Sequence, residues 1–573
     1  MVQDVHSRPD PPGPPADWED LDPRRWLGLS LVLVAGFMDL LDATIVNVAI
    51  PSIQRDLDAQ YASIEWMVSA YLLAFASVLI TGGRLGDIVG RKRVFLIGVL
   101  GFTVASALCG IAPTPAVLIG SRFLQGAMAA LMVPQILAII HVTFPPEERG
   151  KVFGLFGGII GSAAVAGPIL GGVLVEANLW DLQWRPIFLV NIPVGLIVSI
   201  LAWRVLRESR SPTAAKLDLL GVVLVTAAVL LVIYPLTEGR ANGWPLWGYL
   251  MMLSAIPVLA VFVVYERRRT ATVGSPLVVL RLFKARAFDG GLLVWLLFQV
   301  ALGAFFFVWT LYMQFGLGWT ALHAGLTAVS FALGAAPAAG ISIQVLTPKF
   351  GRKVVMAGAL LNAAGFGGYI WAIHHFGTDI TSWEMVAPLV VSGFGFGLVV
   401  APITDIVLSG VPTRDAGSAS GLFNTTQQLG AALGIALVGV LMFHLIAQEA
   451  DGSVDKVEPR LRADLAAVQI TGRNQDDLIQ GFRTCVTDRA NATDPSATPE
   501  SCRRPVMGAP NPQAARQVAK ILTDNGTEAN AKDFSSSFSM GLWYLIGALV
   551  ICFLGMFTLP RRATYDSTLA DIE

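Results

Sequence analysis

The sequence predicts an all-α integral membrane protein, and its composition, its long apolar runs and an internal repeat carry that prediction. Hydrophobic residues make up 54% of the 573 residues and charged residues only 14%, whereas soluble domains carry about 25% charged residues. A run of about 20 apolar residues crosses about 30 Å of hydrocarbon as a helix. A helix also satisfies its backbone hydrogen bonds internally, as a bilayer requires.

The apolar runs number fourteen, and we expect one membrane helix from each. They lie at residues 27–50, 61–82, 93–112, 115–141, 150–175, 186–206, 217–237, 246–266, 288–314, 321–347, 353–376, 384–411, 416–446 and 537–559. Residues 1–25 are acidic and rich in proline, and no basic stretch precedes an apolar core, so they are predicted to be a disordered cytoplasmic tail and not a signal peptide. Residues 560–573 form a second cytoplasmic tail.

An internal repeat divides these helices into two halves. "GKVFGLFGGIIGSAAVAGPILGGVL" from Gly150 aligns with "GSASGLFNTTQQLGAALGIALVGVL" from Gly417, and "GRK" at 90–92 recurs at 351–353. These offsets match the fifth helix with the thirteenth and predict two six-helix pseudo-repeats with two inserted helices between them. The predicted domains are an N-terminal bundle, an inserted pair and a C-terminal bundle, at 26–210, 217–266 and 287–559. Duplicated halves are typical of transporters with a site near the membrane midplane.

The positions of lysine and arginine predict the orientation. Most of the 40 basic residues lie on the side of the two termini, whereas the six short loops of the other side hold only Arg55, Arg185 and Arg240. Cytoplasmic loops hold the excess of basic residues, so both termini are expected in the cytoplasm. The net charge of −1 predicts no particular partner. No basic groove with interleaved aromatic residues is present, so nucleic acid is not expected.

A long polar segment, 448–535, separates the last two predicted helices and is expected outside the cell as a loop or small cap. Two stretches in it, "VEPRLRADLAAVQI" and "NPQAARQVAKILTD", have helical spacing. Cys485 and Cys502 also lie in it, and an oxidising exterior favours a disulfide between them. Cys109 and Cys552 fall inside apolar helices and are expected to be small core residues.

Four motifs, taken in order, carry a family resemblance. "GGRLGDIVGRKRVFLIG" from Gly82 resembles the signature between helices two and three of the major facilitator superfamily. "LDATIVNVAIP" from Leu41 resembles the first-helix motif of its 14-helix drug:proton antiporters. "SRFLQGAMAA" from Ser121 and "GSAAVAGPILGG" from Gly161 are similar to their fourth-helix and fifth-helix motifs. The resemblance covers roughly residues 25–560 and leaves out the segment 448–535.

The resemblance implies secondary active multidrug efflux, in which protons are exchanged for lipophilic, cationic compounds across a bacterial plasma membrane. It implies a monomer that needs no cofactor besides the proton gradient. The fifth-helix motif argues for export, but proton-coupled uptake of peptides or other metabolites, and export of an endogenous metabolite, antibiotic or lipid, stay open. The sequence contains neither G-x-x-x-x-G-K-[ST] nor H-E-x-x-H, so neither a nucleotide-driven pump nor a metalloenzyme is expected. A sensor that reads a ligand with its external segment is a further alternative.

The resemblance also implies a cytoplasmic latch between the two halves. Its residues are Gly83, Arg84, Asp87, Gly90 and Arg91. Asp87 is expected to face the start of the thirteenth helix near 416–418, where the helix dipole favours an anion, with Arg84 and Arg91 holding it in place. The alternative is that these charges are ordinary anchors at the membrane surface.

Charges inside the spans form the candidate proton and substrate site. Each costs at least about 2.5–3.5 kcal/mol at the bilayer centre on insertion scales. Asp39 and Asp42 are three residues apart, hence on one helix face, and counting 1.5 Å per residue from the outer ends puts Asp42 and Arg122 at one level. A guanidinium that competes with a proton for a buried carboxylate could drive antiport. The alternative is a static ion pair that only fixes packing.

Four other acids lie in or near the spans. Asp405, in the inner half of the twelfth helix, is a further candidate for the same site, although a position facing the cytoplasm explains it equally well. Glu65, Glu176 and Glu384 lie near the outer ends of their helices, where we expect solvent at the interface to accommodate their charge.

Aromatic residues of the ninth predicted helix form a candidate substrate pocket. Most aromatic residues in a span face lipid or core, but four share one helical face, and four polar side chains could add hydrogen bonds. The pocket residues are Phe298, Gln299, Phe305, Trp309, Tyr312, Asn424, Gln427 and Gln428. The fifth helix adds small residues that permit close packing and a bend and, by the resemblance, limit leak. They are Gly161, Gly167, Pro168, Gly171 and Gly172.

Overall fold

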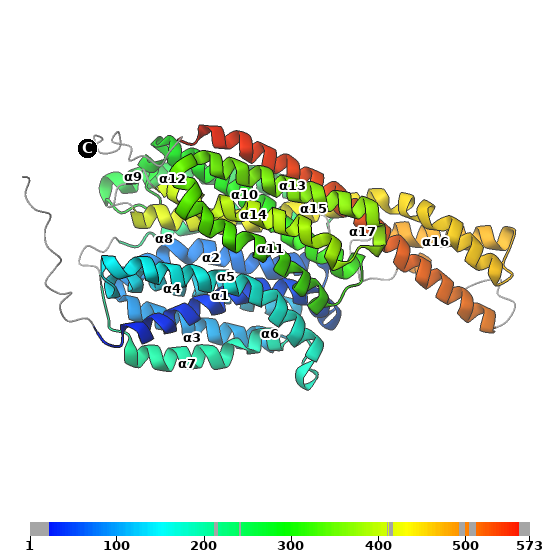
Figure 1. Ribbon diagram of the computed structural model, residues 1–573, viewed down its shortest axis with the longest axis horizontal. Coiled ribbons are helices and arrows are strands. Elements are labelled where there is room, and N and C mark those ends of the chain that lie inside the picture. The colour runs from blue at the N-terminus through cyan, green and yellow to red at the C-terminus, as the bar shows by residue number, and fades with distance from the viewer. Residues whose placement is uncertain are drawn as a thin grey trace, which may run out of the picture.

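The computed structural model describes residues 22–210, 216–239, 242–408, 411, 416–491, 499–503 and 512–560, and every regular element in these ranges is helical. The helices lie side by side along the long axis of the molecule, and three of them project from one end (Figure 1). Both ends of the described chain lie at the opposite end, which we call the inner end because the basic residues predict it to be cytoplasmic. The end with the projection is called the outer end.

The N-terminal bundle contains six membrane crossings. They are formed by α1 (Arg25–Leu57), α2 (Tyr61–Val89), α3 (Arg91–Gly110), α4 (Pro115–Thr143), α5 (Pro146–Ala177), and α6 (Pro186–Leu189) together with α7 (Asn191–Val205). Local signals set the boundaries. Thr114 caps α4 by accepting a hydrogen bond from the Val117 N–H, with Pro115 at the first helical position. Gly90 separates α2 from α3 at φ 128°, which glycine adopts without strain.

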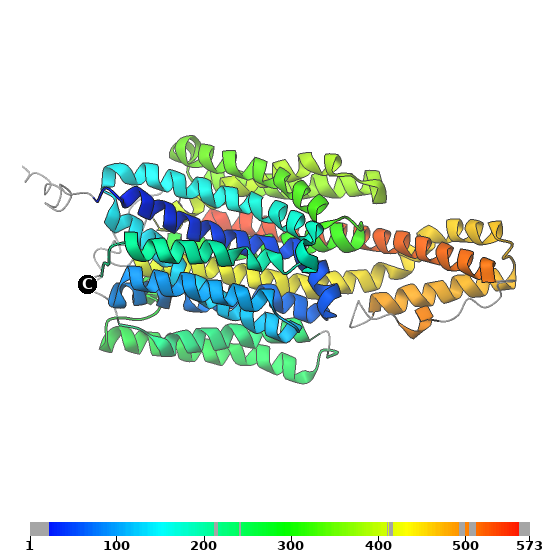
Figure 2. The same cartoon turned by 90° about the horizontal axis from the view of Figure 1, so that it is seen from below.

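The inserted pair, α8 (Leu219–Glu238) and α9 (Leu246–Thr272), runs along one side of the molecule (Figure 2). The Asp218 side chain caps α8 by accepting from the Gly221 N–H at 3.0 Å. Large apolar side chains such as Val223 and Ile256 are more than half exposed, as expected for helices that face lipid.

The C-terminal bundle contains the other six crossings. They are formed by α10 (Arg286–Leu311) with a π-helical turn (Tyr312–Gly316), α11 (Ala321–Ile341) with a π-helical turn (Ser342–Leu346) and α12 (Thr347–Phe350), α13 (Arg352–Phe376), α14 (Ser382–Leu408), α15 (Ala416–Ala467) and α17 (Pro512–Gly555). A helix therefore occupies each of the fourteen predicted spans. Within the described residues, 13 helices are long and apolar enough to cross a membrane. α5 has 32 residues, of which Ala166–Ala177 belong to the described apolar part.

The segment 448–535 is a helical stalk, a more extended structure than the predicted loop or cap. α15 has 52 residues and α17 has 44, and both continue past the bundle, where α16 (Arg473–Asn491) packs against them (Figure 1). The stalk has its own apolar core. Its fully buried members include Val454, Val457, Leu461, Leu465, Val518 and Ala529.

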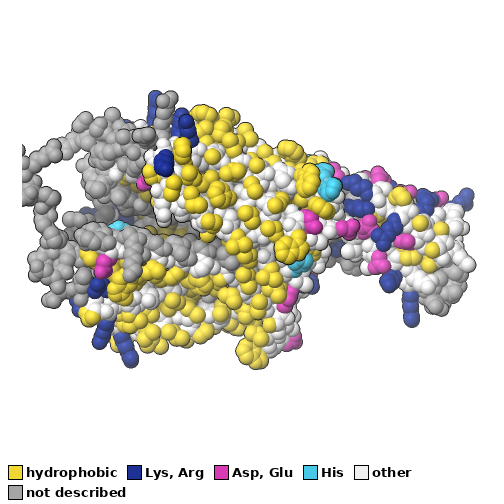
Figure 3. All heavy atoms as spheres, in the orientation of Figure 1, with side chains coloured by type: hydrophobic (Ala, Val, Ile, Leu, Met, Phe, Trp, Pro, Cys, Tyr) yellow, Lys and Arg dark blue, Asp and Glu magenta, His cyan; other side chains and the backbone are white. Residues whose placement is uncertain are grey.

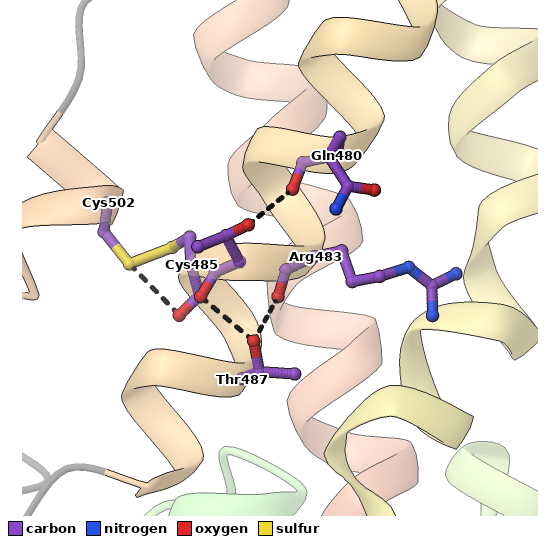
Figure 4. Close-up of a disulfide and its surroundings, with 6 residues drawn as sticks. Gln480, Arg483, Cys485, Thr487 and Cys502 are labelled. Carbon is purple, nitrogen blue, oxygen red and sulfur yellow. Dashed lines mark hydrogen bonds between the residues drawn. A yellow bond between two sulfur atoms is a disulfide. The ribbon is translucent and has the colours of Figure 1, made fainter.

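The predicted disulfide between Cys485 and Cys502 is present in the stalk, with the two Cα atoms 4.8 Å apart. It joins α16 to the short helix Glu500–Arg503. Figure 4 shows the bond beside Thr487, whose hydroxyl donates to the Arg483 carbonyl oxygen at 2.9 Å. The other two cysteines, Cys109 and Cys552, are buried and free, as predicted.

The surface is divided as the membrane prediction requires. Hydrophobic side chains cover the visible face of the bundles, whereas charged side chains gather over the stalk and at the inner end (Figure 3). The same view shows a hollow between the two bundles toward the inner end. Asp39, Asp42 and Arg122, which lie inside the spans, are buried in the protein interior.

The two bundles meet along two pairs of helices, α5 with α11 and α2 with α15. At the outer half of the first pair, Gly325 of α11 lies against the Pro168 carbonyl and Gly172 of α5 against Leu322. In the second pair, the Thr425 hydroxyl donates to the Ala76 carbonyl oxygen at 3.3 Å. Glycines at these contacts let the backbones approach closely, as small residues do in membranes.

Candidate functional site

The centre of the candidate site is an ion pair between Asp42 of α1 and Arg122 of α4. Nη1 of Arg122 lies 2.5 Å from Oδ2 of Asp42, and the side chains of Arg122 and Asp42 are 1% and 0% exposed. The pairing agrees with the prediction that the two residues lie at one depth. A fixed rise per residue in both helices makes that prediction possible without knowledge of the packing.

Amide side chains complete the contacts of the Asp42 carboxylate. Gln125 and Asn191 each donate to Oδ1, at 2.8 and 2.9 Å, while Arg122 also donates to the Gln125 side-chain oxygen at 2.7 Å. Both amides contact the Ser106 hydroxyl. Every one of these side chains is buried, so four helices contribute to a polar network that is shielded from solvent.

Asp39 belongs to the same region but has a different partner. The Tyr71 hydroxyl of α2 donates to Oδ1 of Asp39 at 2.5 Å. The Arg122 guanidinium lies over the Tyr71 ring, 4.3 Å from its centroid, and its Nε donates to the Met67 carbonyl oxygen at 3.2 Å. Tyr71 therefore connects Asp39 to Arg122, because its hydroxyl contacts Asp39 and its ring contacts Arg122.

Helical spacing explains how the chain builds this network. Asp39 and Asp42 of α1 are three residues apart, as are Arg122 and Gln125 of α4, so each pair shares one face of its helix. The site contains two carboxylates and one guanidinium, which leaves a net charge of −1 when both acids are ionised. A low-polarity interior makes that excess charge costly, so the site favours the binding of one additional positive charge.

Sequence reasoning missed four members of the network: Tyr71, Ser106, Gln125 and Asn191. A signal existed for Gln125, which stands in the quoted fourth-helix motif one turn after Arg122. The other three are single polar residues in apolar helices, and the direction in which each helix faces cannot be read from its own spacing.

The other acids lie apart from this network. Asp405 of α14 is exposed, and none of the hydrogen bonds described above involves it, so its role stays a prediction. Glu65 differs from expectation: it is 3% exposed and packs on Gly439 of α15 between the two bundles. The absence of a side chain at Gly439 makes room for the carboxyl group, which burial in the interface removes from solvent.

The predicted substrate-pocket residues lie in and around the interior of the C-terminal bundle. Phe305 stacks on Phe366 of α13 with centroids 4.5 Å apart, and the Trp309 N–H donates to the Tyr369 hydroxyl at 2.9 Å. Of the predicted set, the structure buries Phe298, Gln299, Phe305, Trp309 and Tyr312, half-buries Gln427 and Gln428, and exposes Asn424. Their contact with a substrate stays a prediction, because in this conformation neighbouring rings cover the aromatic members.

The predicted latch is only partly arranged as expected. Arg91 holds Asp87 through an ion pair of 2.9 Å, but Arg84 does not contribute: it donates to the carbonyl oxygens of Lys216, Ser275 and Pro276. Arg84 thus ties α2 to both ends of the inserted pair. Three backbone carbonyls accept hydrogen bonds from the guanidinium, and sequence spacing does not reveal such partners. Asp87 was expected to face residues 416–418. The side chains of 416–417 lie outside the described residues, and the hydroxyl of Ser418 donates to the Leu277 carbonyl oxygen.

Glycines of the predicted latch and of the fifth-helix motif lie at contacts between helices. Gly83 of α2 faces Pro134 of α4. In α5, Gly167 and Gly171 face Thr44 and Ile45 of α1, and Pro168 lies between them. This packing fixes the first helix, which carries Asp42, against the fifth. Gly161 is in α5, but its surroundings lie outside the described residues.

Within the described ranges, no group of three or more His, Cys, Asp or Glu side chains is positioned to hold a metal ion. The polar network around Asp42 is built from one acid, one guanidinium, two amides and a hydroxyl. Such a set of groups can bind a positive charge at a buried carboxylate.

The duplicated helical bundles and their buried charge site define a membrane transporter, and comparison with known proteins agrees. Residues 32–435 match the Major Facilitator Superfamily. The chain belongs to this family. It acts as a transporter and not as an enzyme.

Several curated relatives cover most of the chain. A probable actinorhodin transporter of Streptomyces coelicolor is 39% identical over 556 residues, which cover 96% of this chain and 95% of the relative. A puromycin resistance protein of Streptomyces alboniger is 36% identical over 73% of this chain and 82% of its own. A tetracenomycin C resistance and export protein of Streptomyces glaucescens is 35% identical over 76% and 80%.

Solved structures agree on the fold. The crystal structure of a bacterial homolog to the human lysosomal transporter Spinster, in an inward-facing and occupied conformation, has a TM-score of 0.59 at 15% identity and covers 94% of this chain and 98% of its own. At this identity the likeness concerns the fold alone.

Proposed function

We propose that this transporter exports antibiotic-type small molecules in exchange for protons, with Asp42 as the proton-binding group. The relatives named above are transporters and resistance proteins for different antibiotics, which supports export of this class of compound. The observation that carries the proposal of proton exchange is the buried ion pair of Asp42 and Arg122. Asp39 lies buried beside this pair and adds a second acid.

The exchange follows from electrostatics at this site. In the ionised state, Asp42 accepts hydrogen bonds from Arg122, Gln125 and Asn191. A proton on Asp42 removes the attraction that holds the guanidinium, which keeps its contacts with Gln125 and the Tyr71 ring. Arg122 is then free to turn toward Asp39. The proton and the position of Arg122 are therefore coupled, as antiport requires.

The same excess of negative charge determines which charge a substrate should carry. A site with two carboxylates and one guanidinium attracts cations, so positively charged compounds are the preferred substrates. A bound cation and a proton compete for the same carboxylates, which prevents both from occupying the site in one crossing. This competition links the downhill entry of a proton to the uphill exit of a compound.

Transport into inside-out membrane vesicles tests the proposal. An imposed pH gradient, acidic inside the vesicle, should drive uptake of cationic antibiotics, and an ionophore that collapses the gradient should abolish that uptake. Asp42→Asn should lose gradient-driven uptake but retain exchange of labelled for unlabelled substrate, because the amide still accepts a hydrogen bond. Uptake of every responsive compound at the same rate without a gradient would contradict proton antiport.

A further inference from the structure

A second pair of buried acids lies at the inner end, on the inserted helices, and takes no part in the Asp42 network. Asp218 precedes α8 and Glu266 lies near the end of α9, and the two residues are 1% and 0% exposed. We call their surroundings the joint. It comprises Arg84 of α2, residues 216–218, Glu266 and Arg269 of α9, and residues 275–278.

The two carboxyl groups border the same small space. A Cβ atom at Gly221 would lie 2.7 Å from Oε1 of Glu266 and 2.9 Å from Oδ2 of Asp218. The glycine therefore lets both oxygen atoms approach the first turn of α8. Two ionised carboxylates that border the same small space repel each other strongly when they are buried.

The hydrogen bonds of the two acids are unequal. Asp218 accepts from the N–H groups of Gly221 and Leu277 and from the Tyr265 hydroxyl, at 2.8 to 3.1 Å, and pairs with Arg269 at 3.0 Å. Glu266 accepts from the Val278 N–H through Oε2 at 3.1 Å.

The second oxygen of Glu266, Oε1, is buried and has no donor among the described residues. A buried anionic oxygen that accepts no hydrogen bond and lies beside another carboxylate raises the free energy of the folded protein. A proton on Oε1 removes the cost, because Glu266 then donates a hydrogen bond to Oδ2 of Asp218.

We propose that Asp218 and Glu266 form a proton-binding site in which one proton is carried by Glu266 and shared with Asp218. The state of Asp218 agrees with this role. Burial raises the pKa of Asp218, but hydrogen bonds from Gly221, Tyr265 and the Glu266 side chain, together with the charge of Arg269, outweigh burial and hold the pKa below its usual range.

The joint gives this proton a structural effect. Arg84 donates to the carbonyls of Lys216, Ser275 and Pro276, and Arg269 donates to those of Leu217 and Ser275. These bonds hold both ends of the inserted pair.

The joint also reaches the C-terminal bundle, since the Ser418 hydroxyl of α15 donates to the Leu277 carbonyl oxygen at 3.4 Å. Loss of the proton would leave two adjacent ionised carboxylates in the joint. Their repulsion would weaken the hydrogen bonds that connect the joint to Arg84 of α2 and Ser418 of α15. The site is independent of the proton exchange proposed at Asp42.

Infrared spectroscopy of the purified full-length protein tests the site directly, since a protonated carboxyl group has a C=O stretch that an ionised one lacks. Glu266→Gln keeps the shape and a donor toward Asp218, so it should fold, and its spectrum should lack one protonated-carboxyl band that the wild type shows at neutral pH. Glu176→Gln, the same change at an exposed acid, should retain the band. An unchanged band in Glu266→Gln would overturn the proposal.

A second variant keeps the test decisive. Asp218→Asn removes the neighbouring negative charge, so the same band should vanish at lower pH than in the wild type when the protein is titrated. An identical midpoint in the wild type and Asp218→Asn would mean that the two acids do not share a proton and would equally overturn the proposal.

Discussion

Gln125 is the side chain that holds the charge site together. It donates to Asp42 and Ser106 and accepts from Arg122, so one amide serves three partners in a place without solvent. Removal of a buried hydrogen-bonding partner costs about 1–3 kcal/mol for each group left unsatisfied. The hydrogen bonds of Gln125 therefore stabilise the folded protein in addition to the ion pair.

Gln125→Leu should therefore lower the thermal unfolding temperature of the purified protein, because Asp42 loses a donor and Arg122 an acceptor. Gln299→Leu is the matched control. Gln299 is also buried, but its side-chain oxygen has no hydrogen-bond partner among the described residues, so this variant should unfold close to the wild-type temperature. Equal unfolding temperatures for the two variants would contradict the network.

The charge of Arg122 is expected to influence proton binding by the neighbouring acids. Asp39 and Asp42 lie three residues apart on one face of α1, so the loss of the Arg122 charge acts on both acids, and a variant of Asp39 separates the two effects. Arg122→Ala should change the pH profile of transport, and Asp39→Asn with Arg122→Ala should change it differently. A profile identical to wild type in both variants would show that the arginine does not tune proton binding.

Sequence reasoning located the charged pair of this site but not its polar surroundings. Asp42 and Arg122 could be matched in depth because a helix rises by a constant amount per residue. Asn191 could not be assigned, because its contact depends on how α7 is rotated against α1. Arg84 was assigned wrongly to Asp87 because its true partners are backbone carbonyls, which every residue carries.

At the scale of the elements, α11 packs closely on α5 in the outer half of the interface between the two bundles. A Cβ atom at Gly325 would clash with the Pro168 carbonyl of α5, whereas Gly340 of the same helix has nothing within 4 Å of that position. Gly325→Ala should force α5 and α11 apart, and cysteines introduced in the outer half of the interface should become more reactive to an external thiol reagent. Gly340→Ala should leave this reactivity unchanged, and equal reactivity in the two variants would refute the contact.

The stalk supplies a second element-scale prediction. A disulfide that closes a loop of about 15 residues stabilises by about 3 kcal/mol in the chain-entropy description, and the bond between Cys485 and Cys502 spans 17 positions. Cys485→Ser should make the stalk more sensitive to protease added outside intact cells, while Cys552→Ser, a buried cysteine of α17, should not. Equal digestion of the two variants would show that the bond does not stabilise the stalk.

The helices were predictable where hydropathy marks them and not where they leave the membrane. The apolar runs predicted fourteen spans, and a helix occupies each of them, since lipid demands an apolar surface. The predicted spans stop at 446 and start at 537, whereas α15 continues to Ala467 and α17 already begins at Pro512, with an amphipathic pattern that packs on α16. Hydropathy falls there although helical periodicity persists.

For the whole molecule, the orientation in the membrane is a prediction from the basic residues. A cysteine introduced at Lys520, exposed in the stalk, should react with a membrane-impermeant maleimide in intact cells. A cysteine at Lys353, exposed at the start of α13, should react only in inside-out vesicles. The native free cysteines are buried and give little background, and labelling with the opposite sidedness would reverse the assignment of inner and outer ends.

The central claim is that substrate and proton compete for the carboxylates beside Arg122. Addition of a transported cationic antibiotic to the purified protein in weakly buffered detergent solution measures this competition in one step. The wild type should release protons in proportion to the substrate bound, whereas Asp42→Asn should bind substrate with little or no release. Binding without proton release in the wild type, or equal release in Asp42→Asn, would contradict the account.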